Sequence, residues 1–171
     1  LLPARNHWLQ RSYLPRVINL LREKFPMKAK VLASELEMLV DFDYSGLPQS
    51  IIHGDMFPGN CLYKGEKLGA FLDWEEVGIA PSVLDIGMCV LNLCFYRNKF
   101  KPELFEKFME GYESIRPLTM QEKDSLHLAV RYAGLTNTAW NLFQFGVVHP
   151  DREKVRDSYW NLRLGELKLP V

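Results

Sequence analysis

Apolar side chains recur at every third or fourth position along most of this chain, the spacing that gathers them on one face of an α-helix. One such stripe, near the start of the chain, consists of Leu14, Val17, Ile18, Leu21 and Phe25. The pattern predicts about six helices, over residues 5–25, 27–42, 82–97, 102–115, 119 to about 145, and 151 to near 165.

The ends of these helices carry signals of their own. Pro15 either kinks the first helix or opens a second one at its first turn. Thr119 and Glu122 have the spacing of a capping box, which satisfies backbone N–H groups where a helix begins. Gly146 is well placed to end the same helix, and Asp151 to open the last one.

Three short runs in the middle of the chain predict β-strands, at about residues 50–53, 60–64 and 67–72. They are close together in sequence, which favours hairpin pairing and gives no indication of a parallel sheet. Residues 78–81 are interpreted as the end of the loop region that follows the third of these strands. The fold class predicted is therefore mainly α with a small β-hairpin element (α+β).

Composition narrows the possible functions. The 171 residues suit one domain with a real core, and the 47% hydrophobic and 25% charged residues are typical of a globular protein. Twenty-one Lys and Arg balance 21 Asp and Glu, which argues against a general binder of nucleic acid or of anionic membranes. No apolar run reaches membrane-spanning length. Cys61, Cys89 and Cys94 have apolar neighbours and form no metal-binding pair, so we expect a reducing, cytoplasmic location.

The chemistry is concentrated in residues 51–76. His53, Asp55 and Asn60 form the pattern His-x-Asp-x-x-x-x-Asn, and Asp73 ends the apolar run that follows. This pattern occurs in the catalytic loop of phosphoryl-transfer enzymes of the protein-kinase type. Mg²⁺ prefers hard oxygen ligands and takes one or two of them from the protein, which Asn60 and Asp73 can supply. Asp55 would then face the hydroxyl group that accepts the phosphate.

These motifs, together with Asp85 in the run Val83-Leu84-Asp85-Ile86-Gly87, resemble the aminoglycoside phosphotransferase and choline kinase superfamily. Residues 47–95 look most like its homoserine kinase-like branch. The resemblance implies that Asp55 is the base or orients the hydroxyl, that Asn60 and Asp73 bind Mg²⁺, and that ATP is the donor. It also implies that His53 and Asp85 brace the loop, although Asp85 alone could be an ordinary helix N-cap.

The resemblance also implies a partner lobe. Kinases of this type have an N-terminal sheet with a phosphate-covering loop and a lysine, whereas the residues before position 50 predict helices. We therefore expect residues 1–171 to be a single domain, the helical C-terminal lobe of a protein kinase-like fold. Its catalytic and metal loops lie in residues 51–76, and the N-terminal nucleotide lobe is absent.

The acceptor is predicted from the helix that begins at Thr119. Arg131, Gly134, Thr138 and Asn141 form a polar and small stripe on it, while Trp140 is assigned to the core. Arg131 could grip a substrate carboxylate and Glu75 could attract an amino group, which makes homoserine the first guess. A solvated face or a structural ion pair explains the stripe as well. Choline, ethanolamine, hydroxylysine and aminoglycosides are alternative acceptors, and a non-catalytic binding module or a metal-dependent hydrolase stays open as another class.

Overall fold

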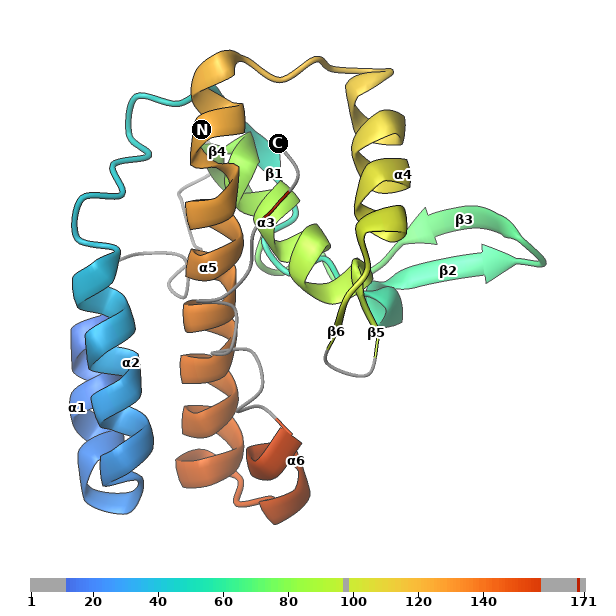
Figure 1. Ribbon diagram of the computed structural model, residues 1–171. Coiled ribbons are helices and arrows are strands. Elements are labelled where there is room, and N and C mark those ends of the chain that lie inside the picture. The colour runs from blue at the N-terminus through green and yellow to red at the C-terminus, as the bar shows by residue number, and fades with distance from the viewer. Residues whose placement is uncertain (1–11, 97–98, 158–168, 170–171) are drawn as a thin grey trace.

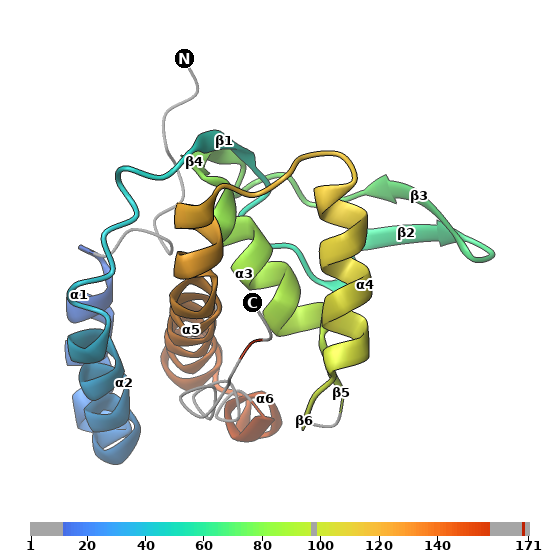
Figure 2. The ribbon, with the colours of Figure 1, turned by 45° about the horizontal axis from the view of Figure 1, so that its top comes forward.

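Helix α5 (Met120–Phe143) is the longest helix of the computed structural model, which describes residues 12–96, 99–157 and 169. Helices α1 (Leu14–Lys24) and α2 (Pro26–Met38) run side by side on one flank of α5, as Figure 1 shows. On the other flank lie α3 (Ser82–Leu93) and, beyond it, α4 (Pro102–Glu113). Figure 2, in which the top of the molecule is turned forward, shows the same order of helices, with α5 between the α1–α2 pair and α3.

Two of the predicted helix starts, at Pro15 and Thr119, are confirmed. The Thr119 side chain accepts a hydrogen bond from the backbone N–H of Glu122 (3.2 Å), and the Glu122 carboxylate accepts one from the backbone N–H of Thr119 (2.9 Å). Pro15 lies in the first turn of α1, so it opens this helix and does not kink it. The part of the predicted helix before residue 12 lies outside the described residues.

A close contact between α3 and α5 depends on one glycine. A Cβ atom on Gly87 would lie 2.6 Å from the backbone oxygen of Ala129, closer than van der Waals contact permits. Buried side chains of both helices surround this point, among them Val83, Ile86 and Val90 of α3 and Leu126, Val130 and Ala133 of α5. This contact fixes α3, and with it Asp85, relative to α5.

The described strands form three separate antiparallel pairs. As predicted, β2 (Cys61–Lys64) and β3 (Lys67–Phe71) make a hairpin, which projects from the helices. By contrast, β1 (Gln49–Ile52) pairs with β4 (Gly78–Pro81), a strand that the sequence analysis took for a loop end. That interpretation was wrong because Gly and Pro at the two ends of the run concealed a strand of four residues. A third pair, β5 (Phe95–Tyr96) with β6 (Lys99–Phe100), was not predicted.

The end of the described chain also differs from expectation. Gly146 does not terminate α5, because the chain continues through a π-helical turn, Gln144–Val148, in which Gly146 packs against Phe25. The last described helix, α6 (Arg152–Asp157), starts after Asp151, whose carboxylate accepts hydrogen bonds from two backbone N–H groups of its first turn. Its predicted end near residue 165 lies outside the described residues. None of the described helices is long and apolar enough to cross a bilayer.

Candidate active site

The loop that follows β1 is held in place by Asp85, from the first turn of α3. One carboxylate oxygen of Asp85 accepts a hydrogen bond from the backbone N–H of His53, and the other accepts one from Gly54, both at 2.9 Å. Gly54 has a φ of 84°, a left-handed conformation that glycine adopts without steric cost. The loop therefore turns sharply at Gly54 and presents Asp55, and Asp85 makes the backbone contacts that the family resemblance implied.

His53 joins this loop to the segment that carries Asp73. Its ring nitrogen Nδ1 accepts a hydrogen bond from the backbone N–H of Asp55 (3.3 Å), and Nε2 lies 2.8 Å from the backbone oxygen of Leu72. Because Nδ1 is an acceptor, the proton belongs on Nε2, which then donates to Leu72. The ring is buried beside Trp74, with the two centroids 4.8 Å apart. His53 thus links the two halves of the site.

Asn60 ties the end of the loop to its beginning. Its amide Nδ2 donates to the backbone oxygen of Asp55 (2.9 Å), and its backbone oxygen accepts from the N–H of Leu72 (2.8 Å). Since the amide nitrogen makes this bond, the amide oxygen Oδ1 of Asn60 points the other way. Asp73, directly after Leu72, has a φ of 61°, an uncommon conformation for a residue other than glycine.

The donor atoms of the site fit a magnesium ion. Asn60 and Asp73 offer an amide oxygen and a carboxylate, the hard ligands that Mg²⁺ accepts alongside phosphate oxygens and water. The described residues contain no cluster of three or more His, Cys, Asp or Glu side chains suited to a metal ion. A site completed by phosphate is consistent with that, because Mg²⁺ is usually bound by only one or two protein carboxylates.

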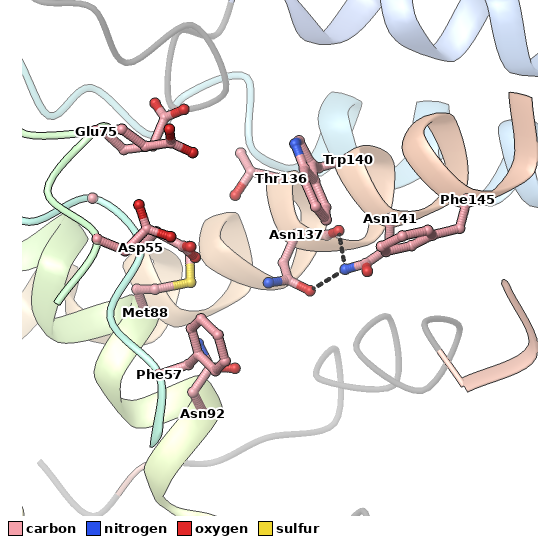
Figure 3. Close-up of a pocket in the computed structure, with 13 residues that line it drawn as sticks. Asp55, Phe57, Glu75, Met88, Asn92, Thr136, Asn137, Trp140, Asn141 and Phe145 are labelled. Carbon is pink, nitrogen blue, oxygen red and sulfur yellow. Dashed lines mark hydrogen bonds between the residues drawn. The ribbon is translucent and has the colours of Figure 1, made fainter. Parts of the chain in front are cut away.

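A cavity of about 510 Å³ lies above these loops, between the catalytic segment and α5 (Figure 3). One wall carries carboxylates, and the facing wall belongs to α5 and the π-helical turn that follows it. The lining residues are Gly54, Asp55, Phe57, Asp73, Glu75, Glu76, Met88, Asn92, Thr136, Asn137, Trp140, Asn141 and Phe145. None of these described lining residues is Lys, Arg or His.

The acidic wall affects the charge state of Asp55. Burial raises the pKa of this carboxyl above its ordinary value, and the nearby negative charges of Asp73 and Glu75 raise it further. His53 and the amide of Asn60 act in the opposite direction and lower the same pKa. A carboxylate with a raised pKa is a better proton acceptor, which is the property a general base needs.

The structure brings most of the predicted site residues together. Asp55, Asp73 and Glu75 line the cavity, while His53, Asn60 and Asp85 are not among its lining residues and hold the loop by hydrogen bonds. Of the stripe on α5, only Asn141 is among the residues that line the cavity.

The placement of Arg131 differs from the expectation of a substrate-binding group. Its Nε donates to Oε2 of Glu35 (2.7 Å) and one terminal nitrogen donates to Oε1 (3.2 Å), and Arg131 does not line the cavity. The alternative considered for this residue, a structural ion pair, is the arrangement found. Helical spacing could not reveal it, because the partner lies on α2 and 96 positions away.

Other lining residues were missed or misassigned. Trp140 was assigned to the core, but it is half-buried and faces the cavity, with its ring 5.6 Å from that of Phe145. Asn137 and Asn92 were not singled out. The spacing of Asn137 and Asn141, one helical turn apart on a mostly apolar helix, is the signal that could have found the first of them.

Comparison with known proteins gives consistent results. The model of a family described as "phosphotransferase enzyme family" matches residues 1–125. The homoserine kinase of Beijerinckia indica is 33% identical over 116 residues, which are 64% of this chain and 35% of that protein. The homoserine kinases of Sinorhizobium fredii and Mesorhizobium japonicum are each 33% identical, over 61% of this chain and over 32% and 34% of their own lengths. The chain thus spans about a third of the curated relatives it matches.

Proposed function

Since the chain belongs to the phosphotransferase enzyme family, we propose that it is the catalytic part of an ATP-dependent kinase for the hydroxyl group of a small amino-bearing metabolite. The comparisons confirm the resemblance to aminoglycoside phosphotransferases and to the homoserine kinase-like branch. The observation that carries the proposal is the cavity in which Asp55 and Asp73 meet above a loop braced by Asp85.

Each residue of the loop has a role in this proposal. Asp55 accepts a hydrogen bond from the substrate hydroxyl and receives its proton as the new oxygen–phosphorus bond forms. The bond between the γ-phosphorus of ATP and its bridging oxygen breaks in the same transfer, and ADP leaves. Asn60 and Asp73 would hold Mg²⁺, which when bound supplies positive charge against the phosphates of ATP. His53 and Asp85 keep these groups at fixed positions, and placement of this kind is a large part of catalysis of phosphoryl transfer.

We further propose that the chain corresponds to the C-terminal lobe of a protein kinase-like fold, as a single domain with its catalytic and metal loops in residues 51–76. A nucleotide-gripping lobe would then be contributed by sequence outside these 171 residues. Two observations support this. The described residues before β1 form helices α1 and α2, and the chain spans about a third of its relatives.

Homoserine is the acceptor we propose first. The proteins named above are homoserine kinases, and Glu75 lines the cavity, where its carboxylate can pair with an ammonium group. Choline, ethanolamine, hydroxylysine and aminoglycosides carry cationic groups as well and are the competing acceptors. The cytoplasmic location stays a prediction from the sequence.

The test is an acceptor panel. Full-length protein, Mg²⁺ and ATP would be incubated with each of the five acceptors, and the formation of ADP and of the phosphorylated product would be measured. The proposal expects transfer to homoserine with the highest kcat/KM. If choline, ethanolamine, hydroxylysine or an aminoglycoside is phosphorylated with a higher kcat/KM, that compound replaces homoserine as the proposed acceptor. ADP formation without a phosphorylated product would contradict the proposed kinase activity.

A further inference from the structure

Side chains of the catalytic loop alternate in direction at Asp55, Met56 and Phe57. Asp55 and Phe57 line the cavity, whereas Met56 between them is buried. The backbone at Phe57 is extended, with φ −148° and ψ 167°, and in extended backbone the side chains of residues i and i+2 point to the same side. Figure 3 shows both side chains leaving the loop toward α5. The Phe57 ring is therefore a neighbour of the group that the Asp55 carboxylate binds.

The Phe57 ring lies directly against a glycine. A Cβ atom on Gly59 would lie 2.4 Å from ring atom Cε2 and 2.9 Å from Cζ, so the ring can occupy this position only because residue 59 has no side chain. The 3₁₀ turn Pro58–Asn60 brings Gly59 to the ring, and the backbone N–H of Asn60 closes this turn by donating to the oxygen of Phe57 (2.9 Å). Gly59 itself is not among the lining residues.

The backbone that carries the ring is held on both sides, while the ring keeps free surface. The amide Nδ2 of Asn92 donates to the backbone oxygen of Met56 (3.1 Å), and the turn fixes the oxygen of Phe57. The Phe57 side chain is nevertheless 39% exposed, and it lines the cavity. An apolar ring in a fixed position gains free energy when the carbon atoms of a ligand cover it.

This arrangement acts on one particular atom of the acceptor. In the proposed mechanism the reacting hydroxyl donates a hydrogen bond to Asp55, so the carbon atom that carries the hydroxyl lies beside Phe57. A primary alcohol presents a CH₂ group there, which the ring can cover. A secondary alcohol presents a further carbon substituent, which competes with the ring for the same space. Overpacking of this kind is unfavourable where neighbouring groups cannot move.

We propose that Phe57 is a specificity-determining residue that restricts the acceptor to primary alcohols, and that Gly59 is its positioning residue. The inference rests on the proposed kinase function and narrows it. Homoserine, choline and ethanolamine carry primary hydroxyl groups, whereas the hydroxyl group of hydroxylysine is secondary. The ring therefore divides the competing acceptors into a group that fits and one that does not.

The experiment compares homoserine with 2-amino-4-hydroxypentanoate, which is homoserine with one methyl group added at the hydroxyl carbon. Both epimers at that carbon are used. kcat and KM for each compound, and KM for MgATP, are measured with the full-length protein and its variants. If ethanolamine or choline exceeds homoserine in the acceptor panel, the comparison uses that compound and its analogue methylated at the hydroxyl carbon.

The variants separate the ring from its support. Phe57→Ala removes the ring, Phe57→Leu keeps part of its apolar surface, and Gly59→Ala displaces it. A double variant combines Phe57→Ala with Gly59→Ala. Phe108→Leu, in helix α4 and outside the cavity, and Gly46→Ala, where an added Cβ atom meets nothing within 4 Å, are the matched controls. Thermal unfolding of each variant reports whether it folds.

The expected result is a change in selectivity. The wild type should prefer homoserine to both methylated epimers by roughly ten- to two-hundredfold in kcat/KM, the usual effect of one extra methylene group in a pocket. Phe57→Ala should reduce this ratio at least about fivefold, and Phe57→Leu should lie between it and the wild type. Phe57→Ala should also lower kcat/KM for homoserine about three- to tenfold, through lost contact with one or two methylene groups. Both controls should keep the wild-type ratio.

The double variant tests the role of Gly59. Gly59→Ala should raise the KM for homoserine severalfold, because the displaced ring no longer fits the acceptor, while KM for MgATP and the unfolding midpoint change little. In the Phe57→Ala background the same substitution should have no further effect, since no ring remains to be displaced. An equal effect of Gly59→Ala with and without the ring would show that Gly59 does not act through Phe57.

The remaining outcomes distinguish this inference from the proposed function. If the wild type phosphorylates the methylated compounds as well as homoserine, or if Phe57→Ala lowers all these activities by one factor, Phe57 does not select the acceptor while the kinase function stands. A panel in which hydroxylysine is the best acceptor has the same meaning. If no acceptor of the panel is phosphorylated, the proposed function fails and the inference fails with it.

Discussion

The carboxylate of Asp85 accepts a hydrogen bond from the backbone N–H of His53 across 32 positions of sequence, at 2.9 Å. With the second bond, from Gly54, it joins the core helix α3 to the loop that presents Asp55. The position of the proposed base therefore depends on a residue that does not line the cavity.

Removing this brace should destabilise the protein and misplace the loop. Asp85→Ala leaves two backbone donors without their acceptor, so we expect a loss of about 2–4 kcal/mol in the free energy of unfolding. Asp85→Asn retains one oxygen acceptor and should lose less. Chemical denaturation measures both, with Asp124→Ala on the exposed side of α5 as the control. If Asp85→Ala were as stable as the wild type, the two hydrogen bonds that Asp85 accepts would contribute little to the free energy of unfolding.

Substitution by alanine should have opposite effects on stability at two helical glycines, one in the contact between α3 and α5 and one outside it. Gly87→Ala places a Cβ atom 2.6 Å from the Ala129 oxygen and should cost about 1–3 kcal/mol. Gly111, in helix α4, has nothing within 4 Å of the added atom, so Gly111→Ala should stabilise by about 0.5–1 kcal/mol through helix propensity. Thermal melts of the two variants compare them directly, and a Gly87→Ala variant as stable as Gly111→Ala would contradict the close approach.

The ion pair of Arg131 with Glu35 should stabilise the fold without affecting the substrate. The two side chains are 23% and 12% exposed and share two hydrogen bonds, so a double-mutant cycle with both alanine variants should give a coupling of about 1–3 kcal/mol. The KM for homoserine should stay within a factor of about two, since the pair lies outside the cavity. If Arg131→Ala raised the KM for homoserine manyfold and left the stability unchanged, Arg131 would be a substrate-binding residue after all.

The sequence was sufficient to predict that the candidate site residues that are close along the chain also lie close together in space. The spacing of Asp55, Asn60 and Asp73 is a local pattern, and the loop geometry that unites them follows from a few turns and one hairpin. Helical periodicity also located the core stripe of α1, of which Leu14, Val17, Ile18 and Leu21 are buried. The spacing of the site residues and the periodicity of the helices depend on residues that are near one another in the sequence, so the sequence shows them directly.

What the sequence could not supply depends on contacts between distant segments. Periodicity placed Trp140 on an apolar face of α5, but it could not show that this side chain lines the cavity. The strand at Gly78–Pro81 becomes visible only through its pairing with β1, and the role of Arg131 only through Glu35. In each case tertiary packing decides the outcome, and propensity is a weak guide to it.

The charge of the acidic wall should appear in the pH profile. Burial, Asp73 and Glu75 raise the pKa of Asp55, so kcat/KM should fall at a higher pH than for an exposed aspartate as acidification protonates the base. Glu75→Gln removes one of the negative charges that raise this pKa, and the acid limb should therefore move to lower pH. Glu106→Gln, exposed on α4, is the control that should leave the limb in place. If Glu75→Gln left the acid limb of the pH profile in place or moved it to higher pH, the negative charge of Glu75 would not raise the pKa of Asp55.

The most direct test of the proposed kinase is the rate of phosphoryl transfer by Asp55→Asn in the full-length protein, with Asp124→Asn as the matched surface control. The substitution preserves shape but removes the proton acceptor, so kcat should fall by about a hundred- to ten-thousandfold while the unfolding midpoint changes little. The Asp124→Asn control should retain wild-type kcat. A folded Asp55→Asn variant with nearly wild-type kcat would contradict the assignment of Asp55 as the catalytic base.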